Sequence, residues 1–497
     1  MKHEKLSQAL NEVRDQYIEE AAKKKRRNHA PWLGAVAAVL ALVILAGIFL
    51  RPHSPQTPAV HLETAPTESV SVQPPTLLPP ITTGLPKYQI AKPMYPTMLK
   101  YPTDSDSLFD EYDAWRENVN AIHNQPQGYG DVMQDYFKTV TPALLTDSDS
   151  TNPVCSPVNI YMALAMLAET ADGETRQELL DFLGADTIEQ LRTLCSYIWN
   201  GHYWDDGATT SILGNSLWLD DQYTFDLKCA ERLAQYYYAS SFSGDLGTEE
   251  MNKALQNWLN EQTGGLLEEH ANAIELDPLS VFALASTIYY KVNWSDWFIA
   301  EHNTEQTFHG KNQAITATFM NQTLGNDTYY WGDNYGAVSL DLKDNSQMWL
   351  ILPDEGTDIN SVLQSNNLWS MISTSSFEYE NQKQMKINLS VPKFKVDASM
   401  ELKNILGDLG LTNTMSGTAD FSNLAPDKAL TVGSVTHAAT VEINEEGVAA
   451  AAFTFIMEFG AVMPSENEID FVLDRPFIFI IQSSDGLPLF AGVVNQL

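Results

Sequence analysis

The segment NEEGVAAAAFTF (Asn444–Phe455) places four consecutive alanines between a Glu-Glu-Gly triplet and a run of β-forming residues. Alanine favours helices and is disfavoured in strands. The neighbouring segments HAATVEI and FTFIMEF are nevertheless rich in β-branched and aromatic residues, which is typical of strands. The stretch alone therefore leaves two interpretations open. It is either a surface helix or small-residue turn, or an extended segment whose small side chains serve a purpose.

Length and composition restrict the class of protein. The 497 residues are 44% hydrophobic, enough for one large or two medium domains with real cores. A formal net charge of -35 argues against nucleic acid as a partner and against a heparin-like cofactor, because little would neutralise a polyanion. Three cysteines, Cys155, Cys195 and Cys229, are too few for a disulfide framework, so we expect buried small hydrophobic side chains.

The N-terminus predicts a membrane anchor. Residues 1–31 contain the basic cluster KKKRR, and Trp32–Leu50 follows as nineteen uncharged residues. As a helix this run is about 28 Å long, which spans a bilayer core. A signal peptide is the competing interpretation, but its apolar core would be shorter. We therefore expect one uncleaved transmembrane helix at 32–50, a cytoplasmic segment at 1–31 and an extracellular remainder.

The rest of the chain divides into a tether and a globular domain. Residues 51–102 hold twelve of the 24 prolines, which indicates an extended extracellular linker. The domain is expected at 103–497 as a mixed α+β fold. We predict helices over 107–122, 131–145 and 398–411, and a helix within 251–269 that is closed by its Gly pair. A further helix has Ser156 at its N-cap and Pro157 at its first position. We also predict a central strand over 280–294, a hairpin over 337–356, a strand pair over 384–398, and two closing strands joined at 483–486.

Motifs for catalysis or metal binding are lacking in the sequence. It contains no His-Glu-x-x-His, Cys-x-x-Cys or Gly-x-Ser-x-Gly pattern. Ser434 and His437 are three residues apart, which on a strand directs them to opposite faces. We expect neither an enzyme, nor a metal site, nor a cofactor.

Insertion of residues 444–455 into the middle of a sheet would explain the alanines. Such a strand must pass between existing strands, so small side chains lower the barrier, and Gly447 supplies freedom at the hinge. The following residues 457–470 have the composition of an exposed loop, and RPFIFII after them is a strong strand. Loop-to-sheet insertion is a known switching device.

On these segments the chain resembles the serpins over nearly all of residues 130–497, and is identified as a bacterial, membrane-anchored member. VEINEEGVAAAAFTF is similar to their hinge signature. Six further motifs follow the family's order: NPVCSPVNIYMALAMLAETADGET, TIYYKVNWSDWF, VPKFKVD, LGDLGL, ADFSNLA and DRPFIFIIQSSDGLPLFAGVV.

The resemblance implies a serpin fold of about nine helices and three β-sheets, with an exposed reactive-centre loop at about 445–475. It implies a monomer that inhibits serine proteases as a suicide substrate. The protease cleaves the loop and forms an acyl-enzyme, and the loop then inserts into a five-stranded sheet. Two alternatives stay open: a non-inhibitory binding protein, and an inhibitor of cysteine proteases.

The resemblance to the serpins also implies functional roles for individual residues of this chain. The family's spacing puts the scissile bond at Ala461–Val462, with Met457, Phe459 and Met463 as neighbouring possibilities. No Arg or Lys lies between Val448 and Leu473, so elastase-like or subtilisin-like targets are expected. The hinge comprises Glu445, Glu446, Gly447, Val448, Ala449, Ala450, Ala451 and Ala452.

The family's shutter region, which controls opening of the sheet, matches Ser156 and His437. Ser286 stands where the family usually has asparagine, and Val292 where it usually has glycine. These departures concern the threshold for opening rather than the fold. A helix cap and a buried histidine also explain Ser156 and His437, and both interpretations can hold together.

Overall fold

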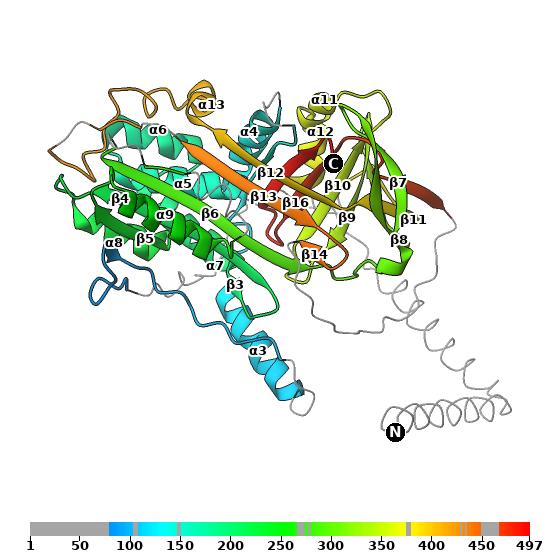
Figure 1. The fold of residues 1–497 in the computed structure, drawn as a ribbon, viewed down its shortest axis with the longest axis horizontal. Coiled ribbons are helices and arrows are strands. Elements are labelled where there is room, and N and C mark those ends of the chain that lie inside the picture. The colour runs from blue at the N-terminus through cyan, green and yellow to red at the C-terminus, as the bar shows by residue number, and fades with distance from the viewer. Residues whose placement is uncertain are drawn as a thin grey trace, which may run out of the picture. The chain divides into compact units, whose positions relative to one another are not determined.

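A computed structural model describes residues 79–102, 108–146, 151–265, 274–276, 280–373, 379–427, 430–432, 435–448 and 467–497. Helices gather in the first half of the chain and strands in the second (Figure 1). The α+β class is therefore confirmed. In the described ranges, none of the helices combines the length and the apolar character needed to cross a membrane, and the predicted span at 32–50 lies outside them.

The first sheet contains the strand predicted at 280–294. Five long strands run in the order β5, β4, β6, β13, β12, with β1 at the edge, β14 between β6 and β13, and β3 beside β4. Their bounds are β1 (Gln89–Ala91), β3 (Trp204–Asp205), β4 (Thr210–Asp220), β5 (Ala239–Gly244), β6 (Phe282–Asn293), β12 (Phe394–Glu401), β13 (Thr436–Ile443) and β14 (Gly447–Val448).

The second sheet includes the closing strands of the chain. Its order is β15, β11, β8, β9, β10, β16, β17, β2, with β7 beside β8. The bounds are β2 (Val154–Cys155), β7 (Thr304–His309), β8 (Ala314–Trp331), β9 (Tyr335–Asp341), β10 (Gln347–Pro353), β11 (Gln382–Pro392), β15 (Glu468–Val472), β16 (Phe477–Gln482) and β17 (Pro488–Val494).

Three sheets were expected, whereas the described strands form two hydrogen-bonded networks. The cause is β8. This 18-residue strand pairs with β7 and β11 along most of its length, and then pairs with β9 through Tyr330 and Trp331. One long strand thus joins two of the expected sheets.

Ten α-helices lie in the described residues, close to the expected nine. They are α3 (Leu108–His123), α4 (Gln134–Leu145), α5 (Pro157–Thr170), α6 (Gly173–Leu183), α7 (Ile188–His202), α8 (Leu227–Tyr236), α9 (Glu249–Gln262), α11 (Ile359–Leu363), α12 (Asn366–Ser373) and α13 (Lys403–Asp408).

Helices cover both faces of the first sheet. Neighbouring residues of β4 show this, because successive side chains of a strand point to opposite faces. Leu217 belongs to the main core that contains α5, whereas Trp218 belongs to a second cluster with Leu255 and Leu259 of α9. The central strand β6 is therefore covered on both sides, as predicted.

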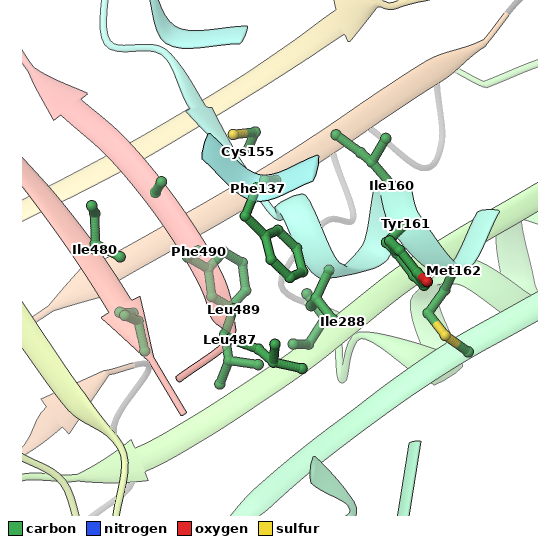
Figure 2. Close-up of a cluster of buried hydrophobic side chains, with 14 of the residues drawn as sticks. Phe137, Cys155, Ile160, Tyr161, Met162, Ile288, Ile480, Leu487, Leu489 and Phe490 are labelled. Carbon is green, nitrogen blue, oxygen red and sulfur yellow. The ribbon is translucent and has the colours of Figure 1, made fainter. Parts of the chain in front are cut away.

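Helix α5 is the centre of the main core. The Oγ atom of Ser156 accepts a hydrogen bond from the Asn159 N–H at 3.4 Å, and Pro157 occupies the first turn, so the predicted cap is confirmed. Figure 2 shows Phe137 of α4, Ile288 of β6 and Phe490 of β17 in one buried cluster beside the start of this helix. Cys155, Cys195 and Cys229 are buried free thiols, as expected.

Local turn chemistry follows the sequence in several places. Gly264 and Gly265, with φ of 58° and 81°, end α9, and the Gly265 N–H donates to Asn260 O at 2.9 Å. β9 and β10 form the predicted hairpin, with Asn345 at φ 64° in its turn. The predicted strand pair at 384–398 is two strands, β11 and β12, but they lie in different sheets.

Part of the predicted linker belongs to the folded domain. Gln89 and Ala91 of β1 pair with Phe242 and Ser241 of β5, and the ring centroid of Tyr95 lies 4.7 Å from that of Trp199. Residues from Gln89 onward thus pack on the domain, although the linker was predicted to run to residue 102. Proline content marks extended backbone, but it does not reveal whether that backbone packs on a domain.

Candidate functional site

Strand β14 occupies the end of a slot between two long strands. Gly447 and Val448 pair with Asn293 and Val292 of β6, and Val448 also pairs with Ile443 of β13, antiparallel in each case. Strand order places only this short strand between β6 and β13 among the described residues. Two residues of the predicted hinge, Gly447 and Val448, therefore already form the start of a strand between β6 and β13.

Gly447 is required at this position for steric reasons. Its φ is 156°, and a Cβ atom built on it would overlap the carbonyl oxygen of Val292 and approach the Cα of Asn293 to 2.6 Å. Both neighbours are backbone atoms of β6, so they cannot move aside as a flexible side chain could. Glycine is therefore favoured at position 447 for two reasons: it gives the hinge backbone freedom, and it leaves room for the backbone of β6.

A tight turn fixes the approach to the hinge. Asn444 Oδ1 accepts hydrogen bonds from the N–H groups of Glu446 at 2.9 Å and Gly447 at 3.3 Å. Trp294, just after β6, donates from its backbone N–H to Glu446 O and from its indole Nε1 to Asn444 O, both at 2.9 Å. The indole is 1% exposed, so the turn rests on a rigid buried ring.

Glu445 is held by an ion pair at the base of the hinge. Lys393 Nζ lies 2.5 Å from Glu445 Oε1, and Asn303 Nδ2 donates to the same oxygen at 2.5 Å. Partial burial on its own would raise the pKa of this carboxyl, but the hydrogen bonds from Lys393 and Asn303 and the lysine charge outweigh it and lower the pKa. Carboxylate, ammonium and amide together anchor the hinge to the loop before β12 and to the loop before β7.

The predicted shutter residues Ser156 and His437 are in contact. The Ser156 backbone N–H donates to His437 Nε2 at 2.9 Å, and both residues are buried. Burial lowers the pKa of His437 to about 4, so the imidazole is neutral at physiological pH. Because Nε2 accepts a hydrogen bond, the proton is on Nδ1.

Ser286 has a different partner from the other two shutter residues. Its hydroxyl donates to Asn215 Oδ1 of β4 at 2.8 Å, while Asn215 Nδ2 donates to Tyr237 O at 2.8 Å. Ser286 and His437 nevertheless line one cavity of about 260 Å³, whose wall also includes Asn159 and Leu164 of α5. We call this space between β6 and β13 the slot cavity.

The remaining predicted site residues lie outside the described part of the chain. These are Ala449, Ala450, Ala451, Ala452, Ala461 and Val462. The position of the scissile bond stays a prediction. The described residues bracket this segment, with β14 before it and β15 after it.

The sequence model of a family described as "Serpin (serine protease inhibitor)" matches residues 133–497. The chain belongs to the serpin family. Among curated relatives, Serpin-ZX of Arabidopsis thaliana is 28% identical over 370 residues, covering 71% of this chain and 93% of that protein. An uncharacterized serpin-like protein of Thermococcus kodakarensis is 27% identical, covering 79% of this chain and 90% of that protein.

Solved structures agree with this serpin assignment. The native state of the thermophilic serpin tengpin is similar with a TM-score of 0.66 at 25% identity, covering 75% of this chain and 95% of that one. The native stressed conformation of AtSerpin1 from Arabidopsis has a TM-score of 0.63 at 25% identity, covering 75% of this chain and 99% of that one. The serpin fold expected from the sequence is confirmed.

Four residues of this serpin site were missed by sequence reasoning. Lys393 lies in the quoted motif VPKFKVD, but its partner is 52 residues away in sequence, and no local signal indicates the pairing. Asn303 and Trp294 are still more remote in sequence from their partners Glu445 and Asn444, at 142 and 150 residues. Asn159 had a usable signal, since it lies three residues after Ser156, where helical spacing puts it on the same side of α5.

Proposed function

We propose that this serpin is an irreversible suicide-substrate inhibitor of extracellular serine proteases. The observation that carries the proposal is the placement of Gly447–Val448 between β6 and β13, followed in sequence by four alanines. The hinge is engaged at one end of a slot, and the residues next in line have the smallest chiral side chains. A strand of such residues meets little steric resistance as it enters.

Continuing the hinge register supports insertion as far as the shutter. Val448 pairs with Val292, so each further loop residue would meet the preceding residue of β6, and Thr454 would meet Ser286. On the other side Val448 pairs with Ile443, so Thr454 would also meet His437. The pairings with β6 and with β13 would thus place the same loop residue, Thr454, beside both shutter residues, as expected for a strand that fills the slot.

The chemistry of inhibition uses the protease's own mechanism. The protease serine would attack the carbonyl of Ala461, the Ala461–Val462 amide bond would break, and Val462 would become a new N-terminus. The ester to Ala461 would remain while the loop inserts and displaces the enzyme. Because no Arg or Lys lies between Val448 and Leu473, we propose elastase-like or subtilisin-like targets rather than trypsin-like ones.

We also propose that the inhibitor is anchored in the membrane through residues 32–50 and faces outward. The support is compositional: nineteen uncharged residues follow a basic cluster. The test is extraction of membranes from producing cells with alkaline carbonate, and then protease treatment of intact cells. Release by carbonate would contradict an integral anchor, and protection of the domain in intact cells would contradict the orientation.

The test of inhibition is incubation with an elastase and intact-mass spectrometry under denaturing conditions. We expect a covalent adduct and a released peptide that begins at Val462. Cleavage between 449 and 466 without any adduct would identify a substrate and contradict the proposal. A parallel incubation with a papain-like protease would show whether the trap extends to cysteine proteases.

A further inference from the structure

The slot cavity contains buried polar atoms that lack partners. The side chain of Asn159 is 1% exposed, and neither its Oδ1 nor its Nδ2 has a hydrogen-bond partner among the described residues. Thr287 Oγ1, on a residue that is 2% exposed, is also without a partner there. An unpaired buried amide is costly, so the two amide atoms of Asn159 call for a polar partner.

The rest of the cavity wall is mainly apolar. Leu164 and Leu167 of α5, Leu255 and Leu259 of α9, and Leu284 of β6 line it. The polar residues Asn159, Ser286, Thr287 and His437 therefore share a cavity with these and two further leucines, Leu276 and Leu402. A space lined in this way suits a molecule with one polar end and one aliphatic end.

The charges around the cavity favour a neutral ligand. Its lining includes one ionisable residue that carries charge at neutral pH, Glu275, and that side chain is exposed. His437 is neutral and can donate from Nδ1, while Ser286 and Thr287 offer hydroxyls. A carboxylate or an ammonium would have to leave water without a fixed counter-charge.

We propose that the slot cavity binds a small neutral amphiphile, with a primary amide as the best head group, paired with the Asn159 carboxamide. An amide both donates and accepts, so it can satisfy Nδ2 and Oδ1 together. The aliphatic tail lies along the leucines. A second consequence rests on the proposed inhibitory function. The bound ligand occupies the slot between β6 and β13 and hinders insertion of the reactive-centre loop.

The direct test uses the full chain and hexanamide as the probe, with binding followed by saturation-transfer NMR and calorimetry. We expect binding at one site. Hexanoate should bind at least about tenfold more weakly, because its charge is unpaired in the cavity. Equal affinity for the two probes, or no saturable binding of hexanamide, would overturn the proposal.

Variants separate the proposed contact from non-specific binding. Asn159→Leu keeps the side-chain size and removes both amide atoms, and we expect at least about a tenfold loss of hexanamide affinity. Asn120→Leu, on the exposed side of α3, is the matched control and should bind as the parent does. Ala163→Leu, which extends into the cavity from α5, should also abolish binding, so the proposal stays testable if Asn159→Leu fails to fold.

The consequence for inhibition is measured separately. With elastase present, saturating hexanamide should raise the number of inhibitor molecules consumed per protease inactivated, and the Ala163→Leu protein should show no response to the probe. An unchanged stoichiometry would overturn the regulatory consequence. If the chain formed no adduct at all, the proposed function would fail, while the binding experiments would still decide whether the site exists.

Discussion

At the scale of single residues, the pair of Glu445 and Lys393 holds the hinge. We expect Glu445→Gln to lower the free energy of unfolding at pH 7 by about 1 kcal/mol, because a charge-assisted hydrogen bond is lost at a partly buried site. Denaturant unfolding of the two proteins measures this. Glu446→Gln, which removes the neighbouring charge and leaves the pair intact, should change stability less.

The pH dependence of that difference has a definite sign. The pKa of Glu445 is lowered in the folded protein, so its contribution is present above the ordinary carboxyl pKa and is lost as pH falls through the folded value. The gap between parent and Glu445→Gln should therefore narrow in acid. A gap that stayed constant from pH 7 to pH 3 would show that the ion pair is not its source.

His437 gives a second prediction in a different pH window. Its folded pKa is about 4 against an ordinary 6.5, so the unfolded chain takes up a proton first as pH falls. Stability should fall by about 3 kcal/mol between pH 6.5 and pH 4 from this residue alone. His437→Gln preserves an acceptor for the Ser156 N–H and should lack that part of the slope, which unfolding curves at several pH values would reveal.

Residue-level prediction from the sequence succeeded where the chemistry is local. Ser156 followed by Pro157 predicts a helix cap without knowledge of the fold, and the cap is present. The contact of Ser156 with His437 joins residues 281 positions apart and was anticipated only through the family resemblance. Lys393 beside Glu445 was not anticipated, because an exposed-looking lysine in a strand motif carries no sign of its partner.

At the scale of elements, the hinge register predicts which face of the loop must stay apolar. Ala450 would enter beside Tyr290 and Val441, which are buried, whereas Ala451 would enter beside Tyr289 and Thr440, which are half-buried. Ala450→Arg should therefore convert the inhibitor into a substrate and raise the stoichiometry of inhibition at least about tenfold.

Ala451→Arg is the matched control for that substitution. It adds the same side chain one position later, on the more exposed face, and should retain most of the inhibition. Titration of elastase with each variant measures the stoichiometry. Equal loss in both variants would contradict the register, and equal retention would contradict insertion itself.

Element boundaries failed where long-range pairing decides them. Residues 398–411 read as one helix, yet Ala398–Glu401 extend β12 and only Lys403–Asp408 form α13. The reason is the ladder with β13, in which Ala398 pairs with Ala439 and Glu401 with Thr436. A partner strand some 35 residues later overrides local helix propensity, and no window of sequence around residue 400 contains that information.

At the scale of the whole molecule, the sequence predicted the α+β class and the central sheet from patterns, and the serpin topology from resemblance. Sequence patterns could not predict that β8 joins two sheets. A strand that pairs with different neighbours along its length has the same residue pattern as any other long strand. Sequence patterns also could not predict β1. Gln89–Ala91 is short and lies among prolines, and its pairing with β5 depends on an edge formed much later in the chain.

The slot between β6 and β13 also predicts that the intact protein is less stable than the cleaved protein with its loop inserted. Cleavage between 449 and 466 would free the loop to enter between β6 and β13, where residues 449–454 would gain hydrogen-bonding neighbours on both sides. Each net backbone bond contributes about 1 kcal/mol. We therefore expect the cleaved protein to unfold at a temperature at least about 5 °C higher than the intact one, as measured by calorimetry.

The charged variant supplies the control for this last prediction. Cleaved Ala450→Arg should gain little or no thermal stability, because burial of the guanidinium beside Tyr290 and Val441 opposes the added strand. A gain in the parent that disappears in this variant would assign the stabilisation to insertion. A gain of the same size in both would place its origin elsewhere in the domain, and no gain in either would mean that the slot does not accept the loop.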